Sequence, residues 1–461
     1  MKLLTSVVIV LGIIVSYLPL SLQNAFSIAL VAGRHTRHRN SESAAEDHNA
    51  RHHNASSRGD QEHLQHKSGG VMTVRKEAGN PVYNCSAFNA YINGKIFNGK
   101  FKHDYSNCPK EIWLLDMFAA DENRQLTDKV LINVGYNKGY SFAEWLAVFA
   151  PWTGITSAGW YQGIGSFTEY KIRKPCGICL DCKISFANKI NNQSQSILNA
   201  SAATSHNSFY YPTSSFTSQH SKSRHPYVTI VGLDINPANL GLLKHVVKTI
   251  ESSKGRANFR HSSLFAITAA AGENNSIVEV QICDVGNEEC AVLADGSNGA
   301  NVSTTKVQQL TVDSLVDVLV HHSIIPSRND NLTSTSSPLL PPSSPPLVKP
   351  VVDILKIDAE GLDPAILNGT RGLLRSSNVR CVIFEAHELG LWSKVNLGDV
   401  IAAFDSFDYD CYFEGVARLW PLTGACWVPL FDIDKRWSNV MCVNRRDRWW
   451  DTVQKYVVFA G

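Results

Sequence analysis

The sequence VLINVGYNKGY, at residues 130–140, joins an apolar run to a loop that contains two glycines. A second segment, DILKIDAEG at residues 353–361, places a similar apolar run before two carboxylates and a glycine. Each run has the length and composition of a buried strand. Because ligands of open parallel α/β sheets bind beyond the carboxyl ends of the strands, the glycines and carboxylates predict a ligand site there.

Apolar runs alternate with amphipathic segments along the rest of the chain. The expected strands cover residues 129–134, 227–233, 257–262, 351–357, 380–384, 411–414 and 439–443. A helix is expected after Gly139, because Phe142, Trp145, Leu146 and Phe149 follow the spacing of one helical face. This alternation predicts a doubly wound, mostly parallel α/β sheet.

Other elements are marked by helix-start residues and by β-rich composition. Asn236 and Pro237 are an N-cap and a first-turn proline. The buried stripe of the helix that they begin is expected to contain Leu240, Leu243, Val247 and Ile250. Residues 110–120 and 400–407 are also expected to be helical, and residues 276–283 to form an added hairpin strand.

The composition divides the 461-residue chain into three parts. Residues 1–33 are a hydrophobic segment, residues 34–80 a polar stalk, and residues 83–461 one domain. The stalk is rich in histidine but nearly lacks large apolar residues, so it is expected to stay disordered, and its irregular histidine spacing disfavours a metal site. Two stretches, about 153–225 and 325–350, are expected to be loop insertions outside the sheet.

The N-terminal segment has no charged side chain between Lys2 and Arg34. It is long enough to cross a bilayer and is expected to be a signal-anchor, with cleavage near Ala29 as the alternative. Arginines after the span argue against a lumenal domain. Asn-x-Ser/Thr sequons argue for one; they begin at Asn54, Asn84, Asn192, Asn199, Asn274, Asn301, Asn331 and Asn368. We expect a membrane protein of the endoplasmic reticulum or Golgi with a lumenal domain, or else a secreted protein.

Charge and cysteine content indicate which partners and which cysteine chemistry to expect. The net charge is +2 and no cluster of Lys or Arg lies within the domain, so no nucleic-acid partner is expected. Eleven cysteines are compatible with disulfides in an oxidising compartment. Cys176, Cys179 and Cys182 could hold zinc with a fourth ligand, but we interpret them as disulfide partners.

The first glycine loop favours one class of cofactor. Gly135 and Gly139 have the spacing Gly-x-x-x-Gly, whereas dinucleotide sites need Gly-x-Gly-x-x-Gly to approach a pyrophosphate. S-adenosylmethionine has no pyrophosphate and suits such a loop, although a plain tight turn is the alternative. Asp234, at the end of the second strand, could accept both ribose hydroxyls of an adenosine cofactor or could cap the following helix.

Five segments in this order resemble the FkbM-type methyltransferases. They are NVGYNKGY at residues 133–140, LDINP at 233–237, LTVDSL at 310–315, DILKIDAEG at 353–361 and VIFE at 382–385. The resemblance covers about residues 130–443 without the two insertions. It implies a Rossmann-like class I fold with an antiparallel last strand, and methyl transfer from S-adenosylmethionine to a hydroxyl oxygen.

The chain departs from the family at three acidic positions. Asn133 replaces the usual Asp, while Asp234 and Asp363 replace Glu. Asn133 can bind only through hydrogen bonds, and Asp234 has a shorter reach. The residues expected to contact the cofactor are Asn133, Gly135, Asn137, Gly139, Asp234 and Asp358.

An alcohol acceptor must lose a proton during methyl transfer. Asp358 and Glu360 follow one strand, and Glu385 and His387 follow the next, so all four can face the same crevice. We expect Glu360 or His387 to be the general base and Asp358 to orient the cofactor or loop. Glu360 could instead pair with Lys356. Two carboxylates without further ligands make no specific cation site, so no metal is expected.

The expected function is O-methylation of a sugar or another hydroxyl-bearing small metabolite in the secretory pathway. Asn133 and the long insertions also suit a catalytically silent relative that acts as a lumenal glycan-binding or scaffold protein. An NAD-linked oxidoreductase is disfavoured because the third glycine is missing.

Overall fold

The computed structural model describes nine parts of the chain. They are residues 85–97, 113–122, 128–168, 172, 226–252, 262–287, 303–325, 351–415 and 418–458. The predicted N-terminal segment, the stalk and the string from Cys176 to Cys182 lie outside these parts, as does nearly all of the insertion at 325–350. No helix among the described residues is both long and apolar enough to cross a membrane.

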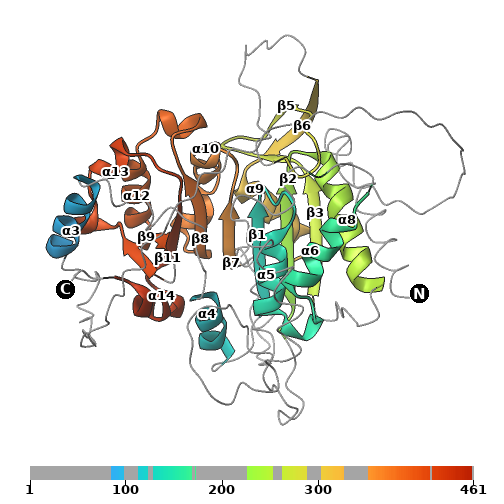
Figure 1. Ribbon diagram of the computed structural model, residues 1–461, viewed down its shortest axis with the longest axis horizontal. Helices are drawn as coiled ribbons and strands as arrows, with labels where there is room; N and C mark the ends of the chain where they lie inside the picture. Colours follow the sequence, from blue (N-terminus) through green and yellow to red (C-terminus); the bar gives the residue numbers. More distant parts are fainter. Residues whose placement is uncertain are drawn as a thin grey trace, which may run out of the picture.

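A single eight-stranded sheet organises the fold, in the order β10-β9-β11-β8-β7-β1-β2-β3 (Figure 1). The five parallel strands are β1 (Lys129–Val134), β2 (Val228–Asp234), β3 (Ser262–Thr268), β7 (Val352–Ile357) and β8 (Val379–Ala386). The antiparallel pairings are made by β9 (Tyr409–Gly415), β10 (Arg418–Pro421) and β11 (Ser438–Asn444). The chain is therefore a mixed α/β fold with a mostly parallel sheet, compatible with the predicted Rossmann-like class.

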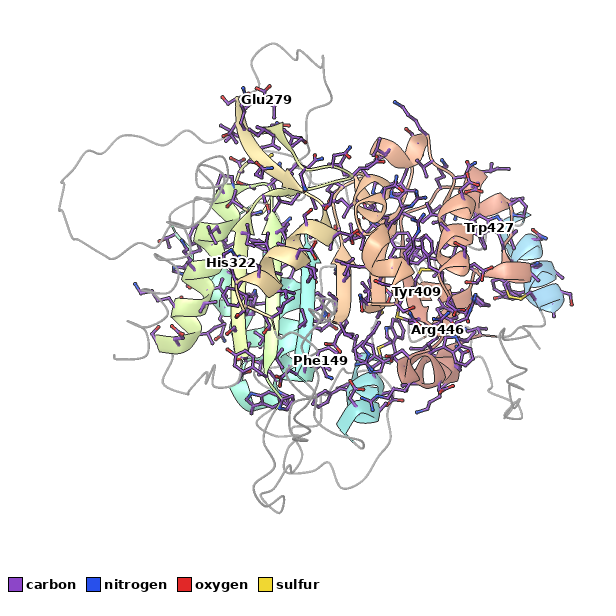
Figure 2. All side chains as sticks on the ribbon, turned by 180° about the vertical axis from the view of Figure 1, so that it is seen from behind. Phe149, Glu279, His322, Tyr409, Trp427 and Arg446 are labelled. Atoms are coloured by element: carbon purple, nitrogen blue, oxygen red, sulfur yellow. A yellow bond between two sulfur atoms is a disulfide. The ribbon has the colours of Figure 1, made fainter. Side chains whose placement is uncertain are left out.

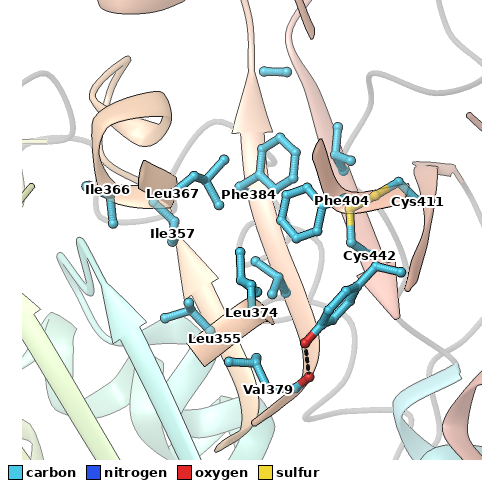
Figure 3. Close-up of a cluster of buried hydrophobic side chains, with 14 of the residues drawn as sticks. Leu355, Ile357, Ile366, Leu367, Leu374, Val379, Phe384, Phe404, Cys411 and Cys442 are labelled. Atoms are coloured by element: carbon cyan, nitrogen blue, oxygen red, sulfur yellow. Dashed lines mark hydrogen bonds between the residues drawn. A yellow bond between two sulfur atoms is a disulfide. The ribbon is translucent and has the colours of Figure 1, made fainter. Parts of the chain in front are cut away.

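Helices cover both faces of this sheet, which confirms the predicted double winding. One face is covered by α4 (Trp113–Glu122), α5 (Tyr140–Phe149), α6 (Ser157–Gly165), α8 (Pro237–Ser252) and α14 (Arg448–Val453), and is called the α5 face below. The other is covered by α3 (Cys85–Phe97), α9 (Val312–His321), α10 (Asp363–Asn368), α11 (Arg371–Arg375), α12 (Leu397–Ser406) and α13 (Leu430–Ile433), and is called the α12 face. Figure 3 shows part of the α12 face, where Phe384 and Phe404 stack at 5.8 Å.

Short elements complete the fold. The 3-10 helices are η2 (Pro151–Thr153), η4 (Gly390–Ser393), η5 (Gly424–Cys426) and η6 (Gln454–Tyr456). A smaller sheet has the order β4-β6-β5, with β4 (Ala270–Ala271), β5 (Ser276–Gln281) and β6 (Thr304–Leu310). The antiparallel pair of β5 and β6 confirms the predicted hairpin strand at 276–283. Because β4 begins two residues after β3 ends, the small sheet stands at the carboxyl edge of the large one, where Glu279 marks it in Figure 2.

Three sequence expectations need correction. The third strand was predicted at 257–262, of which only Ser262 is among the described residues, whereas β3 is Ser262–Thr268. It is an edge strand with half-buried residues, so its apolar signal is weak. The segment 157–165, expected in a loop, forms α6. Its Trp160 indole donates a 2.9 Å hydrogen bond to the Lys138 carbonyl, which fixes the helix on the domain. The buried stripe of α8 consists of Asn239, Leu242, Leu243, Val246 and Ile250, so the predicted Leu240 and Val247 lie at its margin.

A buried ionic network ties the amino ends of the central strands. The Arg380 guanidinium of β8 donates to Asp121 of α4 at 2.7 Å, to Asp353 of β7 at 2.8 Å and to Asp447 at 2.8 Å. Lys129 of β1 adds a 2.8 Å contact with Asp121. These cations lower the pKa of Asp121 to about 2, although burial alone would raise it. The network lies at the edge of the sheet opposite the predicted site, so its role is structural.

Two disulfides stabilise the C-terminal half of the domain. Cys85 of α3 is bonded to Cys426 of η5 across 341 residues of sequence. Cys411 and Cys442 are direct partners on β9 and β11, and their bond is drawn in Figure 3. The Cys381 side chain of β8 is fully buried. The expected use of disulfides is confirmed for these residues.

Candidate functional site

The glycine loop at residues 133–140 and the segment at residues 353–361 meet at the carboxyl edge of the sheet. The Asp358 amide donates a 2.9 Å hydrogen bond to the Val134 carbonyl, which extends the pairing of β1 and β7. Gly135 has φ +79°, and a Cβ built on it would lie 1.8 Å from the Asp358 carbonyl oxygen. A side chain at residue 135 therefore cannot fit while the two loops stay together, which explains the glycine.

Asp234 joins the β1 loop to the β2 loop. Its Oδ2 accepts hydrogen bonds from the Asn137 amide at 2.8 Å and from Asn239 Nδ2 at 3.1 Å. Its Oδ1 accepts from the Asn236 amide at 2.8 Å. An ionised carboxylate has about four acceptor positions, so three bonds leave about one for a ligand. Asn236, not Asp234, caps α8, because its Oδ1 accepts from the Ala238 amide.

Asn137 and Gly139 give the β1 loop its shape. Asn137 has φ +45°, a left-handed conformation that Asn tolerates better than most residues. Gly139 has φ +73° and packs so tightly that a Cβ would lie 2.9 Å from the Trp160 ring. The loop therefore rests on α6, an element that sequence reasoning did not predict.

Several polar atoms beneath this loop have no hydrogen-bond partner among the described residues. They are Asn133 Oδ1, Asn137 Oδ1 and the Tyr136 hydroxyl, and all three are shielded from solvent. Burial, with the nearby Asp234 carboxylate, raises the pKa of Tyr136 well above its usual value. Buried polar atoms are normally paired, so two orphaned amide oxygens in one loop suggest a ligand that donates hydrogen bonds.

A row of polar side chains continues across the α5 face. Asn133 and Lys356 are register partners on β1 and β7, and Asn439 pairs with Glu385 across β11 and β8. Directly opposite residues on neighbouring strands project to the same face. Lys356 Nζ contacts Asp358 at 3.7 Å and donates to the Ser141 hydroxyl of α5 at 3.2 Å. The row brings β1, β7, β8 and β11 to one polar surface.

Two buried carboxyls near this surface have raised pKa values, that of Glu385 in β8 and that of Asp363 at the start of α10. Burial raises the pKa of Glu385 well above its usual value, and the Asp358 and Asp363 carboxylates add to the effect. Its Oε2 is shielded from solvent and accepts no hydrogen bond from the described residues. Burial, together with Asp358, raises the pKa of Asp363 to about 7, although its oxygens accept from the Gly361 and Glu385 amides.

Glu360 lies in the tight loop after β7. It has φ +50°, and the next residue, Gly361, has φ +95°. Gly361 touches Gly390 so closely that an added Cβ would lie 2.9 Å from the Gly390 Cα. The loops after β7 and β8 are thus held together by glycine contacts, and the Glu360 carboxylate is near enough to raise the pKa of Glu385.

His387 lies apart from these carboxylates. It lines a small cavity with α12-face residues such as Trp392 and Phe431, and it stacks on Trp437 at 4.7 Å. Its Nδ1 accepts a 3.0 Å hydrogen bond from the Leu389 amide, so the neutral ring carries its proton on Nε2. Burial lowers the pKa of His387. This geometry suits His387 as a hydrogen-bond donor and does not suit it as the predicted general base.

The structure thus brings Asn133, Gly135, Asn137, Asp234, Asp358 and Glu360 to one edge, with Gly139 supporting their loop. Sequence reasoning gave Asp363 no role at the site and did not choose Glu385 as a base. The sequence contained a feature that could have identified each residue. Glu385 ends an apolar strand, and Asp363 lies five residues after Asp358. No group of His, Cys, Asp and Glu within the described parts of the chain has the geometry of a metal site.

Comparisons with known proteins add no assignment to this geometry. No protein-family model, curated protein or solved structure matches the chain.

Proposed function

We propose that this protein is an S-adenosylmethionine-dependent methyltransferase of the FkbM type that methylates a hydroxyl group of a sugar or another small metabolite. The observation that carries the proposal is the meeting of three loops at one sheet edge. Gly135 lies against the Asp358 backbone, and the Asn137 amide binds Asp234. The mostly parallel sheet with an antiparallel β11 agrees with the class I fold that the resemblance implies.

The chemistry of the edge suits a cation. Asp234, Asp358, Glu360, Asp363 and Glu385 gather there around Lys356. Even with Asp363 and Glu385 protonated, the remaining carboxylates outnumber the lysine. Such a surface repels a pyrophosphate and attracts a sulfonium and an ammonium group. The orphaned oxygens of Asn133 and Asn137 are acceptors for an ammonium donor. The fit therefore supports S-adenosylmethionine over a dinucleotide.

When bound, the cofactor would supply a methyl group activated by its sulfonium charge. The protein then has to position the acceptor hydroxyl and to receive its proton. Glu385 and Glu360 are the candidate bases, because both lie beside Asp358. A carboxylate with a raised pKa is the stronger base once the positive charge of a bound cofactor favours its ionised form, which favours Glu385. Glu360 keeps the role predicted from sequence as the second candidate.

We also propose that the domain works in the lumen of the endoplasmic reticulum or Golgi. Two disulfides support an oxidising compartment. The two sequon asparagines within the described residues, Asn274 and Asn368, are exposed and could carry glycans. Residues 1–33 would anchor the chain in the membrane, with secretion after cleavage as the alternative.

Calorimetric titration tests the cofactor assignment. The purified chain should bind S-adenosylmethionine and S-adenosylhomocysteine, and should bind NAD at least tenfold more weakly. Labelled S-adenosylmethionine and a lumenal extract should then identify the methylated acceptor. Folded wild-type protein that binds neither adenosyl ligand would overturn the cofactor assignment.

Single substitutions separate the candidate bases. Glu385→Gln should lower the turnover of the identified acceptor by about 10²-fold or more while cofactor affinity changes little. Glu360→Gln should lower the turnover less than Glu385→Gln does, and His387→Asn should lower it least. Equal losses for Glu385→Gln and His387→Asn would count against Glu385 as the base.

A catalytically silent glycan-binding protein is the second candidate. It is favoured by Asp234, whose carboxylate already accepts three protein hydrogen bonds and keeps little capacity for ribose hydroxyls. This candidate predicts binding on a glycan array by protein that has no measurable affinity for S-adenosylmethionine. Methyl incorporation by the same preparation would exclude it.

A further inference from the structure

The small cavity beside the carboxyl end of β8 contains hydrogen-bond donors that lack acceptors. It is lined on the α12 face by His387, Trp392, Phe413, Phe431, Lys435 and Arg436, among others. His387 Nε2, Trp392 Nε1 and Arg436 Nη1 are all shielded from solvent, and none has a partner among the described residues. His387 and Trp392 are only 3% and 1% exposed, so neither reaches bulk water. Three residues that line one cavity therefore each have a buried nitrogen without a partner among the described residues.

All three nitrogens can only donate. The Leu389 amide occupies His387 Nδ1, so Nε2 carries the ring proton. An indole N–H and a guanidinium have no acceptor capacity. These groups cannot satisfy one another, and each of them destabilises the folded chain while it is buried without an acceptor. The cavity thus calls for an occupant that accepts hydrogen bonds.

The charged residues that line the cavity indicate the charge of the ligand that would bind there. Arg436 is neutralised by Asp434, with its Nε 2.8 Å from that carboxylate. Lys435 Nζ donates to the carbonyls of Trp392 and Val395, and no carboxylate among the described residues pairs with it. The two cations and one anion leave a net charge of +1. The free volume is about 10 Å³, close to the least that holds one water-sized species.

We propose that this cavity is a binding site for a small anion, either a free halide-sized ion or the carboxylate oxygen of a bound molecule. Its donors are His387 Nε2, Trp392 Nε1 and Arg436 Nη1, and Lys435 supplies the charge. The site is separate from the proposed cofactor edge, because His387 lies over the α12 face while Glu385 lies on the α5 face. It stands whether or not the proposed methyl transfer is correct.

Thermal unfolding of the full chain tests the site. Midpoints are measured against increasing sodium chloride, bromide, formate or acetate, with gluconate added to hold the ionic strength constant. Gluconate is too large for the cavity. A saturable rise in midpoint with at least one small anion is expected. A response to halides alone identifies a free-ion site, and a stronger response to formate or acetate identifies a carboxylate site.

Two substitutions assign the response to this cavity. Trp392→Phe keeps the stack on Phe384 and removes only the indole donor, and Arg436→Gln removes the charge. Each should weaken the apparent anion affinity at least fivefold. Trp113→Phe is the matched control, because Trp113 is another buried tryptophan, on the opposite face, and its Nε1 also has no partner within the described parts of the chain. Its anion response should equal that of wild type.

Crystals of the wild-type chain soaked in bromide give a test that does not depend on variant stability. Anomalous scattering should place bromide within hydrogen-bond distance of Trp392 Nε1. Identical midpoints in all salts, as expected for a cavity that holds only water, would overturn the proposal. So would a saturable response that Trp392→Phe and Arg436→Gln leave unchanged.

Discussion

The backbone amide of Asn137 donates a 2.8 Å hydrogen bond to Oδ2 of Asp234, across 97 residues of sequence. This bond holds the β1 loop to the end of β2. Asp234 was expected to bind ribose hydroxyls, yet three protein donors already surround its carboxylate. The main role of the Asp234 carboxylate is therefore to fix the conformation of the β1 loop. A contact with a ribose would be an additional role.

Replacing Asp234 tests its role in the loop. Asp234→Ala leaves the Asn137 and Asn236 amides without their acceptor, so unfolding free energy should fall by about 1–3 kcal/mol. Affinity for S-adenosylmethionine should fall as well, because the loop loses its support. Urea denaturation and calorimetry measure the two effects. Asp284→Ala changes an exposed aspartate of the same region and should alter neither; an unchanged stability of Asp234→Ala would contradict the loop role.

Gly135→Ala tests the contact between the two motifs. The added Cβ would lie 1.8 Å from the Asp358 carbonyl oxygen at a left-handed φ, so the loops must separate. Cofactor binding should be lost, and stability should fall by about 1–3 kcal/mol. Gly241→Ala is the control, because its Cβ meets nothing within 4 Å in α8. That variant should gain up to about 1 kcal/mol of stability and keep its affinity.

Asp363 should make stability depend on pH. Its pKa is about 7 in the folded protein and 3.8 in the reference state, so the folded chain holds the extra proton between these values. The stabilisation is complete below pH 4 and is lost as pH rises to 7. Asp363→Asn removes this titration. From pH 4 to pH 8, the unfolding free energy of the variant should therefore improve relative to wild type by roughly 2–4 kcal/mol.

Urea denaturation at pH 4.5, 6 and 8 measures this difference. Asp284→Asn serves as the reference, because it makes the same substitution at an exposed aspartate. A difference for Asp363→Asn that stays constant, or that favours wild type at high pH, would contradict the raised pKa of the Asp363 carboxyl.

Arg380→Met tests the ionic network at the amino edge. The substitution leaves Asp121 and Asp353 buried with Lys129 as their main cation, so stability should fall by about 3–5 kcal/mol. Removal of the guanidinium also ends its 3.7 Å contact with the Trp449 ring. Arg446→Met, at a side chain that is 72% exposed, should be nearly neutral. Similar losses of unfolding free energy in both variants would show that the buried network of Arg380 adds no more stability than an exposed ion pair.

Most of the strands could be predicted because their signal is local. β1 lies at the predicted residues, and β2, β7, β8, β9 and β11 start and end within two residues of their predictions. β3 was misplaced, because an edge strand has only half-buried residues. α6 was missed, because serine, glycine and aromatic residues resemble a loop until Trp160 finds the Lys138 carbonyl.

The site was only partly predictable for a related reason. The end of each strand is visible in the sequence, so the meeting of Gly135, Asp234 and Asp358 at one edge follows from a parallel sheet. The side of the sheet on which a side chain lies depends on packing after the strand ends. His387 therefore lies on the α12 face, although it is only two residues beyond Glu385 on the α5 face.

The sequence by itself determined the alternation of strands and helices, the glycine that the first loop requires and the carboxylates at the strand ends. These follow from apolar periodicity and backbone geometry, which act over a few residues. The tertiary structure alone decided that Asp234 is occupied by protein amides, that Glu385 is buried among carboxyls and that Arg380 lies among three aspartates. Charge and hydrogen bonding between residues far apart in the chain depend on distance and burial, which exist only after the chain has folded.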